Sequence, residues 1–157
     1  MTQTKLHEEE GNPKIEREFS EHKKIVLHHG DTYDFLKTIP NDTFKLIITS
    51  PPYNIGKIYE QRTDFLSYLK VHESIIKELV RTLRSDGSLC WEVGNYVENG
   101  EVFPLDIYYY DLFKDQGLKL RNRIIWYFGH GLHSHRRFSG RYETILWFTK
   151  SNKYREL

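Results

Sequence analysis

The segment Thr49-Ser50-Pro51-Pro52-Tyr53-Asn54 is the part of this 157-residue chain best suited to chemistry. It follows the apolar run Phe44–Ile48, so a strand is expected to stop at a proline pair, which has no N–H for a sheet ladder. The Ser50 hydroxyl and the Pro51 carbonyl are hydrogen-bond acceptors in a stiff backbone, and Tyr53 adds an aromatic face. Open α/β sheets bind their ligands at the carboxyl ends of strands. The simplest alternative is a proline pair in an ordinary surface loop.

This segment resembles the Ser/Asp/Asn-Pro-Pro-Tyr motif of DNA amino-methyltransferases, which methylate the exocyclic amine of cytosine or adenine. That amine is a poor nucleophile because its lone pair is delocalised into the base ring. The resemblance implies that the Ser50 hydroxyl and the Pro51 carbonyl hold the two amine hydrogens and aim the lone pair at a methyl donor. Pro52 stiffens the same backbone, and Tyr53 offers a surface on which an extruded base stacks. These four residues are the predicted catalytic residues.

Three further segments resemble the permuted, or beta, group of these enzymes, in which the Pro-Pro-Tyr segment precedes a glycine-rich cofactor segment. They are Gly30-Asp31 before a short helix, Asp86-Gly87-Ser88 before a strand, and the strand at 141–148. The resemblance covers about residues 24–150 and implies S-adenosylmethionine as cofactor and double-stranded DNA as substrate, in a restriction-modification setting. Serine at the first motif position resembles the cytosine-N4 enzymes more often than the adenine-N6 enzymes.

The elements expected around the motif form an α/β fold. The apolar periodicity predicts helices over 33–39, 64–83 and 103–116, and strands over 25–29, 44–49, 88–93, 120–128 and 142–149. Ser85-Asp86-Gly87 is expected to end the long helix. The predicted class is a partial class I, Rossmann-like methyltransferase sheet, with parallel strands that end in an antiparallel hairpin. Residues 1–22 are expected to be a flexible arm, 23–150 the catalytic part, and 151–157 a tail.

Composition limits the possible partners and compartments. A formal charge of +1 gives no general affinity for nucleic acid, so DNA contact must rest on a local patch. Cys90, the only cysteine, lies in an apolar run and is expected in the core. The sequence has neither a long apolar stretch nor a hydrophobic signal region, which predicts a cytoplasmic protein with no membrane partner.

Two places are candidates for contacts with the cofactor and DNA. Asp31 is expected to accept a hydrogen bond from the adenine amino group of the cofactor, and its alternative role is to cap the following helix. Segment 129–141 holds three histidines and three arginines. Because arginine forks match phosphate geometry, Arg136 and Arg137 are predicted DNA contacts, as are Asn54 and Lys57 after the motif. A solvated loop is the alternative, and no metal site is predicted there, since cysteine and carboxylate ligands are absent.

The family's Phe-x-Gly-x-Gly cofactor segment does not occur in this sequence. In the family's sheet, two strands separate the strand ending at Asp31 from the strand ending at Ser50. Three outcomes are open: a complementing methyltransferase half supplies these strands, the chain is a truncated remnant, or its first two strands pair directly. The sequence therefore predicts the catalytic, amino-terminal half of a DNA amino-methyltransferase. The alternatives are a non-catalytic subunit or remnant, or a methyltransferase acting on RNA or protein.

Overall fold

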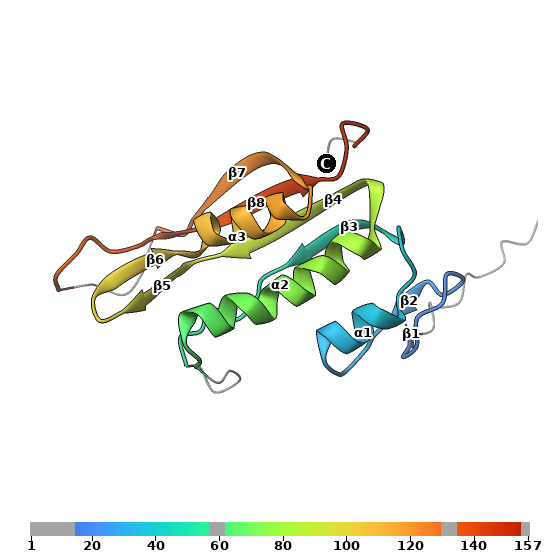
Figure 1. Cartoon of the computed structure of the whole chain (residues 1–157), viewed down its shortest axis with the longest axis horizontal. Helices are drawn as coiled ribbons and strands as arrows, with labels where there is room; N and C mark the ends of the chain where they lie inside the picture. Colours follow the sequence, from blue (N-terminus) through green and yellow to red (C-terminus); the bar gives the residue numbers. More distant parts are fainter. Residues whose placement is uncertain (1–14, 57–61, 130–134, 155–157) are drawn as a thin grey trace, which may run out of the picture.

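A four-stranded sheet forms the centre of the computed structural model, which describes residues 15–56, 62–129 and 135–154 (Figure 1). Its spatial order is β3 (Phe44–Thr49), β4 (Leu83–Val93), β8 (Tyr142–Thr149) and β7 (Lys119–Tyr127). β3 and β4 run parallel, whereas β8 is antiparallel to both β4 and β7. The predicted α/β class, with parallel strands before an antiparallel hairpin, is confirmed.

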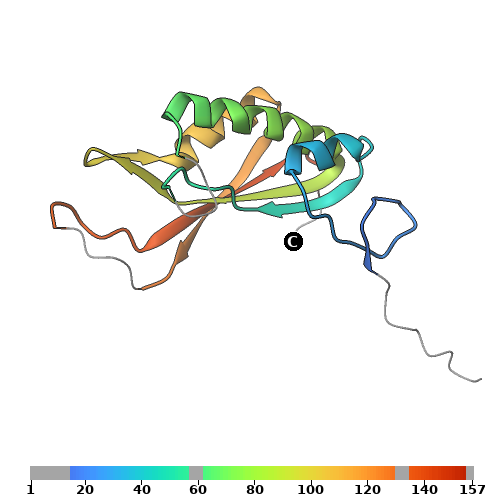
Figure 2. The same ribbon diagram turned by 90° about the horizontal axis from the view of Figure 1, so that it is seen from below.

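Three helices cover one face of this sheet (Figure 2). They are α1 (Thr32–Thr38), α2 (Phe65–Thr82) and α3 (Leu105–Asp115). α1 and α2 each begin after an aspartate, Asp31 and Asp64, whose carboxylate accepts a hydrogen bond from a first-turn N–H at 3.0 Å. None of the helices in the described segments has the length and apolar character needed to cross a membrane.

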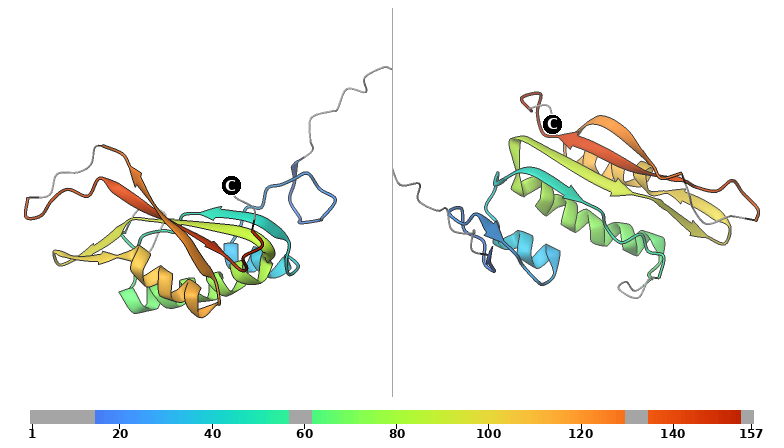
Figure 3. Two further views of the ribbon diagram at one scale, coloured as in Figure 1. Left: turned by 90° about the horizontal axis from the view of Figure 1, so that it is seen from above. Right: turned by 180° about the vertical axis from the view of Figure 1, so that it is seen from behind.

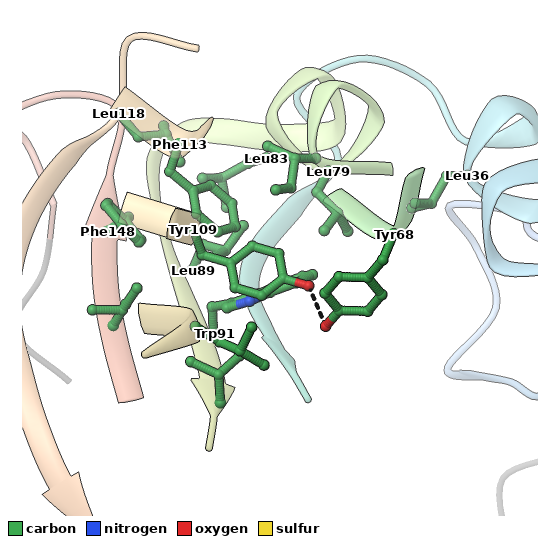
Figure 4. Close-up of a cluster of buried hydrophobic side chains, with 14 of the residues drawn as sticks. Leu36, Tyr68, Leu79, Leu83, Leu89, Trp91, Tyr109, Phe113, Leu118 and Phe148 are labelled. Atoms are coloured by element: carbon green, nitrogen blue, oxygen red, sulfur yellow. Dashed lines mark hydrogen bonds between the residues drawn. The ribbon is translucent and has the colours of Figure 1, made fainter. Parts of the chain in front are cut away.

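The hydrophobic core lies between these helices and the sheet (Figure 4). Alternate side chains of β4, at Leu89, Trp91 and Val93, point toward the helices and are buried, as the two-residue period of a strand requires. Aromatic rings from α3 pack onto them: the Trp91 ring lies 5.0 Å from that of Tyr109 and 5.2 Å from that of Phe113. The core therefore fixes α3 over β4, the strand next to β3.

Two parts of the sheet region differ from the prediction. The long helix ends at Thr82, so β4 begins at Leu83 instead of residue 88, and its register with β3 is irregular between Phe44 and Leu46. At Gly87 a Cβ atom would lie 3.0 Å from the carbonyl oxygens of Phe44 and Lys45, so only glycine fits where the strands approach. The hairpin of β5 (Asn95–Glu98) and β6 (Glu101–Pro104) was not predicted.

The amino-terminal segment pairs with itself. β1 (Ile15–Glu16) and β2 (Ile25–Val26) form a small parallel pair of two residues each. The predicted strand over 25–29 is thus much shorter. Of the three outcomes left open by the sequence, direct pairing of this strand with β3 does not occur, since β2 bonds to β1. Of the arm predicted over 1–22, residues 1–14 lie outside the described residues and β1 belongs to the remainder.

One face of the sheet is uncovered by the described residues, and neither of its two edges is paired with a further strand among them (Figure 3). β3 is an edge strand there, and side chains that point away from the helices, Leu46 and Ile48, are 44% and 72% exposed. Ile124 and Trp126 of β7 lie on the same face and are also exposed. An apolar edge strand of this kind is a template for further pairing.

Arg81 of α2 holds the carboxyl end of α1. Its guanidinium donates to the carbonyl oxygens of Leu36 and Ile39 and to Asn41 Oδ1, each at 2.8 Å. It also pairs with Glu78 at 2.7 Å. These bonds bring a charged donor to the carboxyl end of α1, where the Leu36 carbonyl also accepts from the Ile39 N–H at 3.0 Å.

We expect Arg81→Ala to lower the free energy of unfolding by about 2 kcal/mol, because hydrogen bonds to a charged donor are lost from partly buried carbonyls. Arg84→Ala is the matched control: its guanidinium pairs with Asp86 at the surface, so a change of about 0.5 kcal/mol or less is expected. Denaturant unfolding of both variants measures the difference. Equal losses would show that the α1 contacts do not carry the effect.

Candidate active site

The Pro-Pro loop lies at the carboxyl ends of the parallel strands β3 and β4. Thr49 is in register with Trp91, so the residues after each strand emerge side by side. Val93 is in register with Thr144, which places the start of β8 beside the carboxyl end of β4. The structure therefore brings together the motif loop, the end of β4 and the segment that leads into β8.

Within the loop, Ser50 and Tyr53 are in direct contact. The Ser50 Oγ and Tyr53 hydroxyl oxygens are 3.1 Å apart, with Ser50 exposed and Tyr53 half-buried. Pro51 between them is buried. The stiff proline pair thus turns the backbone so that two of the predicted catalytic side chains share one hydrogen bond while the serine hydroxyl stays open to solvent.

The Tyr53 ring rests against Gly94, the residue after β4. A Cβ atom at Gly94 would lie 3.1 Å from Cε2 of Tyr53 and 3.3 Å from Oε1 of Glu143. Both contacts are closer than ordinary packing allows, so glycine makes room here for the ring and for the carboxylate of β8. Gly94 is therefore the point where Tyr53 and Glu143 converge.

The surroundings keep Tyr53 protonated. Burial is the main cause that raises the pKa of Tyr53 to about 12, and the negative charges of Glu143 and Glu92 act in the same direction. The hydrogen bond with Ser50 opposes them. At neutral pH Tyr53 is thus a neutral phenol, which can donate one hydrogen bond and still accept another.

A pair of buried tyrosines holds the loop from the core side. The Tyr68 hydroxyl of α2 donates to the Pro52 carbonyl oxygen at 2.7 Å. The Tyr109 hydroxyl of α3 donates to the Tyr68 oxygen, also at 2.7 Å (Figure 4). Burial raises the pKa of Tyr109 far above its ordinary value, so it remains a donor. The motif loop is therefore connected to both long helices.

Asn54, a predicted DNA contact, is buried and has a structural role in this chain. Its side chain is only 2% exposed, and the residue has a positive φ of 59°. Its Nδ2 donates to the Thr63 carbonyl at 2.7 Å, while its Oδ1 accepts from the Thr63 N–H at 2.9 Å. Both ends of the amide thus bond to Thr63 inside the protein, and the predicted DNA contact of Asn54 stays a prediction.

The remaining predicted contacts lie at the surface or outside the described residues. Asp31 is exposed and caps α1, which confirms its alternative role and leaves the cofactor contact a prediction. Arg136 and Arg137 are exposed in the segment that leads into β8, and their DNA contact also stays a prediction. Lys57 lies outside the described residues. No metal-binding cluster occurs among the histidine, cysteine and acidic side chains of the described segments.

Four residues of the site escaped the sequence analysis: Gly94, Glu143, Tyr68 and Tyr109. Gly94 carried a signal, since it directly follows an apolar strand. Glu143 is the single acidic residue at the start of the aliphatic run of β8. The two tyrosines carried none, because helical periodicity places them in a core without indicating which loop their hydroxyls reach.

Comparisons with known proteins show what this chain is similar to. A family model described as DNA methylase matches residues 44–157. The type II methyltransferase M.BglII of Bacillus subtilis is 45% identical over 130 residues, which cover 82% of this chain and 36% of that protein. This chain thus spans little more than a third of the length of that relative.

Two solved structures share the fold. A Thermus thermophilus protein assigned as a DNA modification methylase, in complex with S-adenosyl-L-methionine, is 26% identical, with a TM-score of 0.66. The match covers 82% of this chain and 56% of that one. The cytosine-N4-specific PvuII DNA methyltransferase is 21% identical, with a TM-score of 0.69 over 82% of this chain and 50% of that one.

The charge of Glu143 should be measurable through Tyr53. In Glu143→Gln we expect the pKa of Tyr53 to fall below about 12 but to stay above 10.0, because removing a nearby negative charge favours the phenolate while burial persists. Carbon-13 NMR of labelled tyrosine, assigned with Tyr53→Phe, measures it. Glu101→Gln, in the exposed hairpin strand β6, is the control. An unchanged Tyr53 pKa in Glu143→Gln would contradict the assigned contact.

Proposed function

The chain belongs to the DNA methylase family of N6 and N4 methyltransferases, and we propose that it carries the reaction centre of an enzyme that methylates the exocyclic amine of cytosine or adenine in DNA. The observation that carries this proposal is the Ser50–Tyr53 hydroxyl pair, 3.1 Å apart, in a proline-stiffened loop at the carboxyl end of β3. The likeness to M.BglII supports a type II, restriction-modification setting, and a cytoplasmic location is part of the same proposal.

The residues of this chain would act by orienting the amine. The Ser50 oxygen and the Pro51 carbonyl accept its two hydrogens, so that the nitrogen lone pair turns out of conjugation with the ring. Tyr53 fixes the direction of the serine hydroxyl through their shared hydrogen bond. Its ring, half-buried against Gly94, offers a fixed face for the extruded base. Such preorganisation needs no covalent intermediate with the protein.

The cofactor of this proposal is S-adenosylmethionine, which supplies an electrophilic methyl group when bound. Asp31 is the residue in this chain suited to hold it, because its carboxylate is exposed at the amino end of α1. One oxygen, Oδ1, accepts from the Asp34 N–H, and a carboxylate has further acceptor positions. The fit is partial, since the sequence holds no glycine-rich turn for the methionine part.

We propose that strands outside this sequence, in the same protein or in a separate chain, complete the sheet beside β3. Exposed Leu46 and Ile48 on this edge strand support the proposal, since an apolar edge is normally paired or covered. The partial coverage of M.BglII is consistent with it. The competing proposal, a non-catalytic subunit or remnant, predicts no methyl transfer after completion with the missing strands.

In the completed enzyme, we expect Ser50→Ala or Tyr53→Ala to reduce methyl transfer by about two orders of magnitude, through lost amine orientation and lost base stacking. Ser74→Ala on the exposed side of α2 and Tyr33→Ala on α1 are the matched controls, and both should retain activity. The assay is transfer of radiolabelled methyl groups to duplex DNA. Full activity in both motif variants would remove the loop from the mechanism.

Arg136 and Arg137 should contribute phosphate contacts. Changing both to alanine is expected to flatten the slope of log affinity against log salt by about one to two, with the recognition sequence unchanged. Binding titrations at several salt concentrations measure this slope. Lys23→Ala with Lys24→Ala is the charge-matched control, because this adjacent pair lies by β2, at the other end of the molecule (Figure 1). An identical slope in the arginine variant favours a merely solvated loop.

A further inference from the structure

We propose that Tyr68 and Tyr109 are positioning residues: their linked hydroxyls fix the peptide group after Pro52 and so set the orientation of the Ser50–Tyr53 pair. The fixing of the loop stands on the contacts of these residues alone. Its consequence for catalysis rests on the proposed methyl transfer. Neither tyrosine reaches the open side of the loop, since both are buried behind it.

The loop needs such an anchor because of its own sequence. Pro51 and Pro52 have no N–H groups, so this stretch can be held only through its carbonyl groups and its packing. The Tyr68 hydroxyl donates a hydrogen bond to the Pro52 carbonyl oxygen at 2.7 Å. A peptide group is planar, so holding this carbonyl also fixes the plane that contains the Tyr53 N–H. The direction in which Tyr53 leaves the backbone is thereby set.

Tyr109 makes this anchor directional. A hydroxyl has one hydrogen to donate, and the Tyr68 hydroxyl could rotate away from Pro52 if its oxygen needed no donor. Tyr109, 0% exposed, supplies its own hydrogen to the Tyr68 oxygen at 2.7 Å. The Tyr68 hydrogen is then left for Pro52. Because an unmade hydrogen bond is costly for a buried hydroxyl, the chain of donors runs one way, from α3 through α2 to the loop.

The rings that carry these hydroxyls are themselves held in place. Tyr109 packs edge-on or tilted against Trp91 and His72, with ring centroids 5.0 Å and 5.6 Å away. His72 Nδ1 lies 2.9 Å from the Tyr68 carbonyl oxygen, and burial lowers the pKa of His72, which keeps it neutral at pH 7. The anchor is therefore part of the rigid core and transmits its geometry to the loop.

Amide hydrogen exchange in the 157-residue chain tests the anchor directly. In Tyr68→Phe we expect exchange of the amides at residues 53–56 to accelerate about tenfold, with amides of α2 and β4 unchanged, because one local hydrogen bond is lost while the ring remains. Tyr109→Phe should accelerate the same amides by a smaller factor. Tyr108→Phe is the matched control on α3, since its hydroxyl makes no hydrogen bond among the described residues. Unchanged loop exchange in Tyr68→Phe, or equal acceleration everywhere, would overturn the proposal.

Methyl transfer by the completed enzyme tests the catalytic consequence. Tyr68→Phe should lower kcat about tenfold and leave KM for DNA within about twofold, since misplaced acceptors act on the transition state more than on binding. A faster-exchanging loop with unaltered kcat would overturn the link to catalysis. If the unmodified enzyme transfers no methyl group, the proposed function fails, and hydrogen exchange still decides whether the two tyrosines position the loop.

Discussion

Two consecutive prolines leave the chain without backbone donors at the point where β3 ends, and the arrangement around them compensates for this deficit. The Pro52 carbonyl accepts a hydrogen bond from the Tyr68 hydroxyl. The Asn54 side-chain amide bonds to Thr63, and the Tyr53 ring packs against Gly94. Each anchor comes from a different element or from the loop itself. The surroundings thus supply the hydrogen bonds and packing that the proline pair itself cannot make.

Some elements were predictable because their signals are local. β3 and β8 have the predicted bounds, since each is a β-rich run with sharp ends, and α2 starts one residue after the aspartate that caps it. The motif itself placed Ser50 and Tyr53 at the end of β3, which the structure confirms. Rigid proline chemistry and strand direction need no knowledge of distant partners.

The rest depends on partners far away in the sequence. Asn54 looked like a surface residue of a polar loop, yet its environment is decided by Thr63 and by packing under the motif. Likewise, the sequence left the neighbour of β2 open, because a strand of two residues carries no signal for its partner, and that partner is β1. Tyr68 and Glu143 reach the site only through the crossing of α2 and the register of β8.

The described anchors of the motif loop, which are Thr63 and the elements α2, α3, β4 and β8, all lie within this chain. The geometry of the motif loop is therefore set within this chain, and none of the described anchors comes across the open edge of β3. A gene that was split, fused or reordered at this edge would keep the motif loop together with its anchors. Rearranged orders of the same segments can thus arise without rebuilding the chemistry.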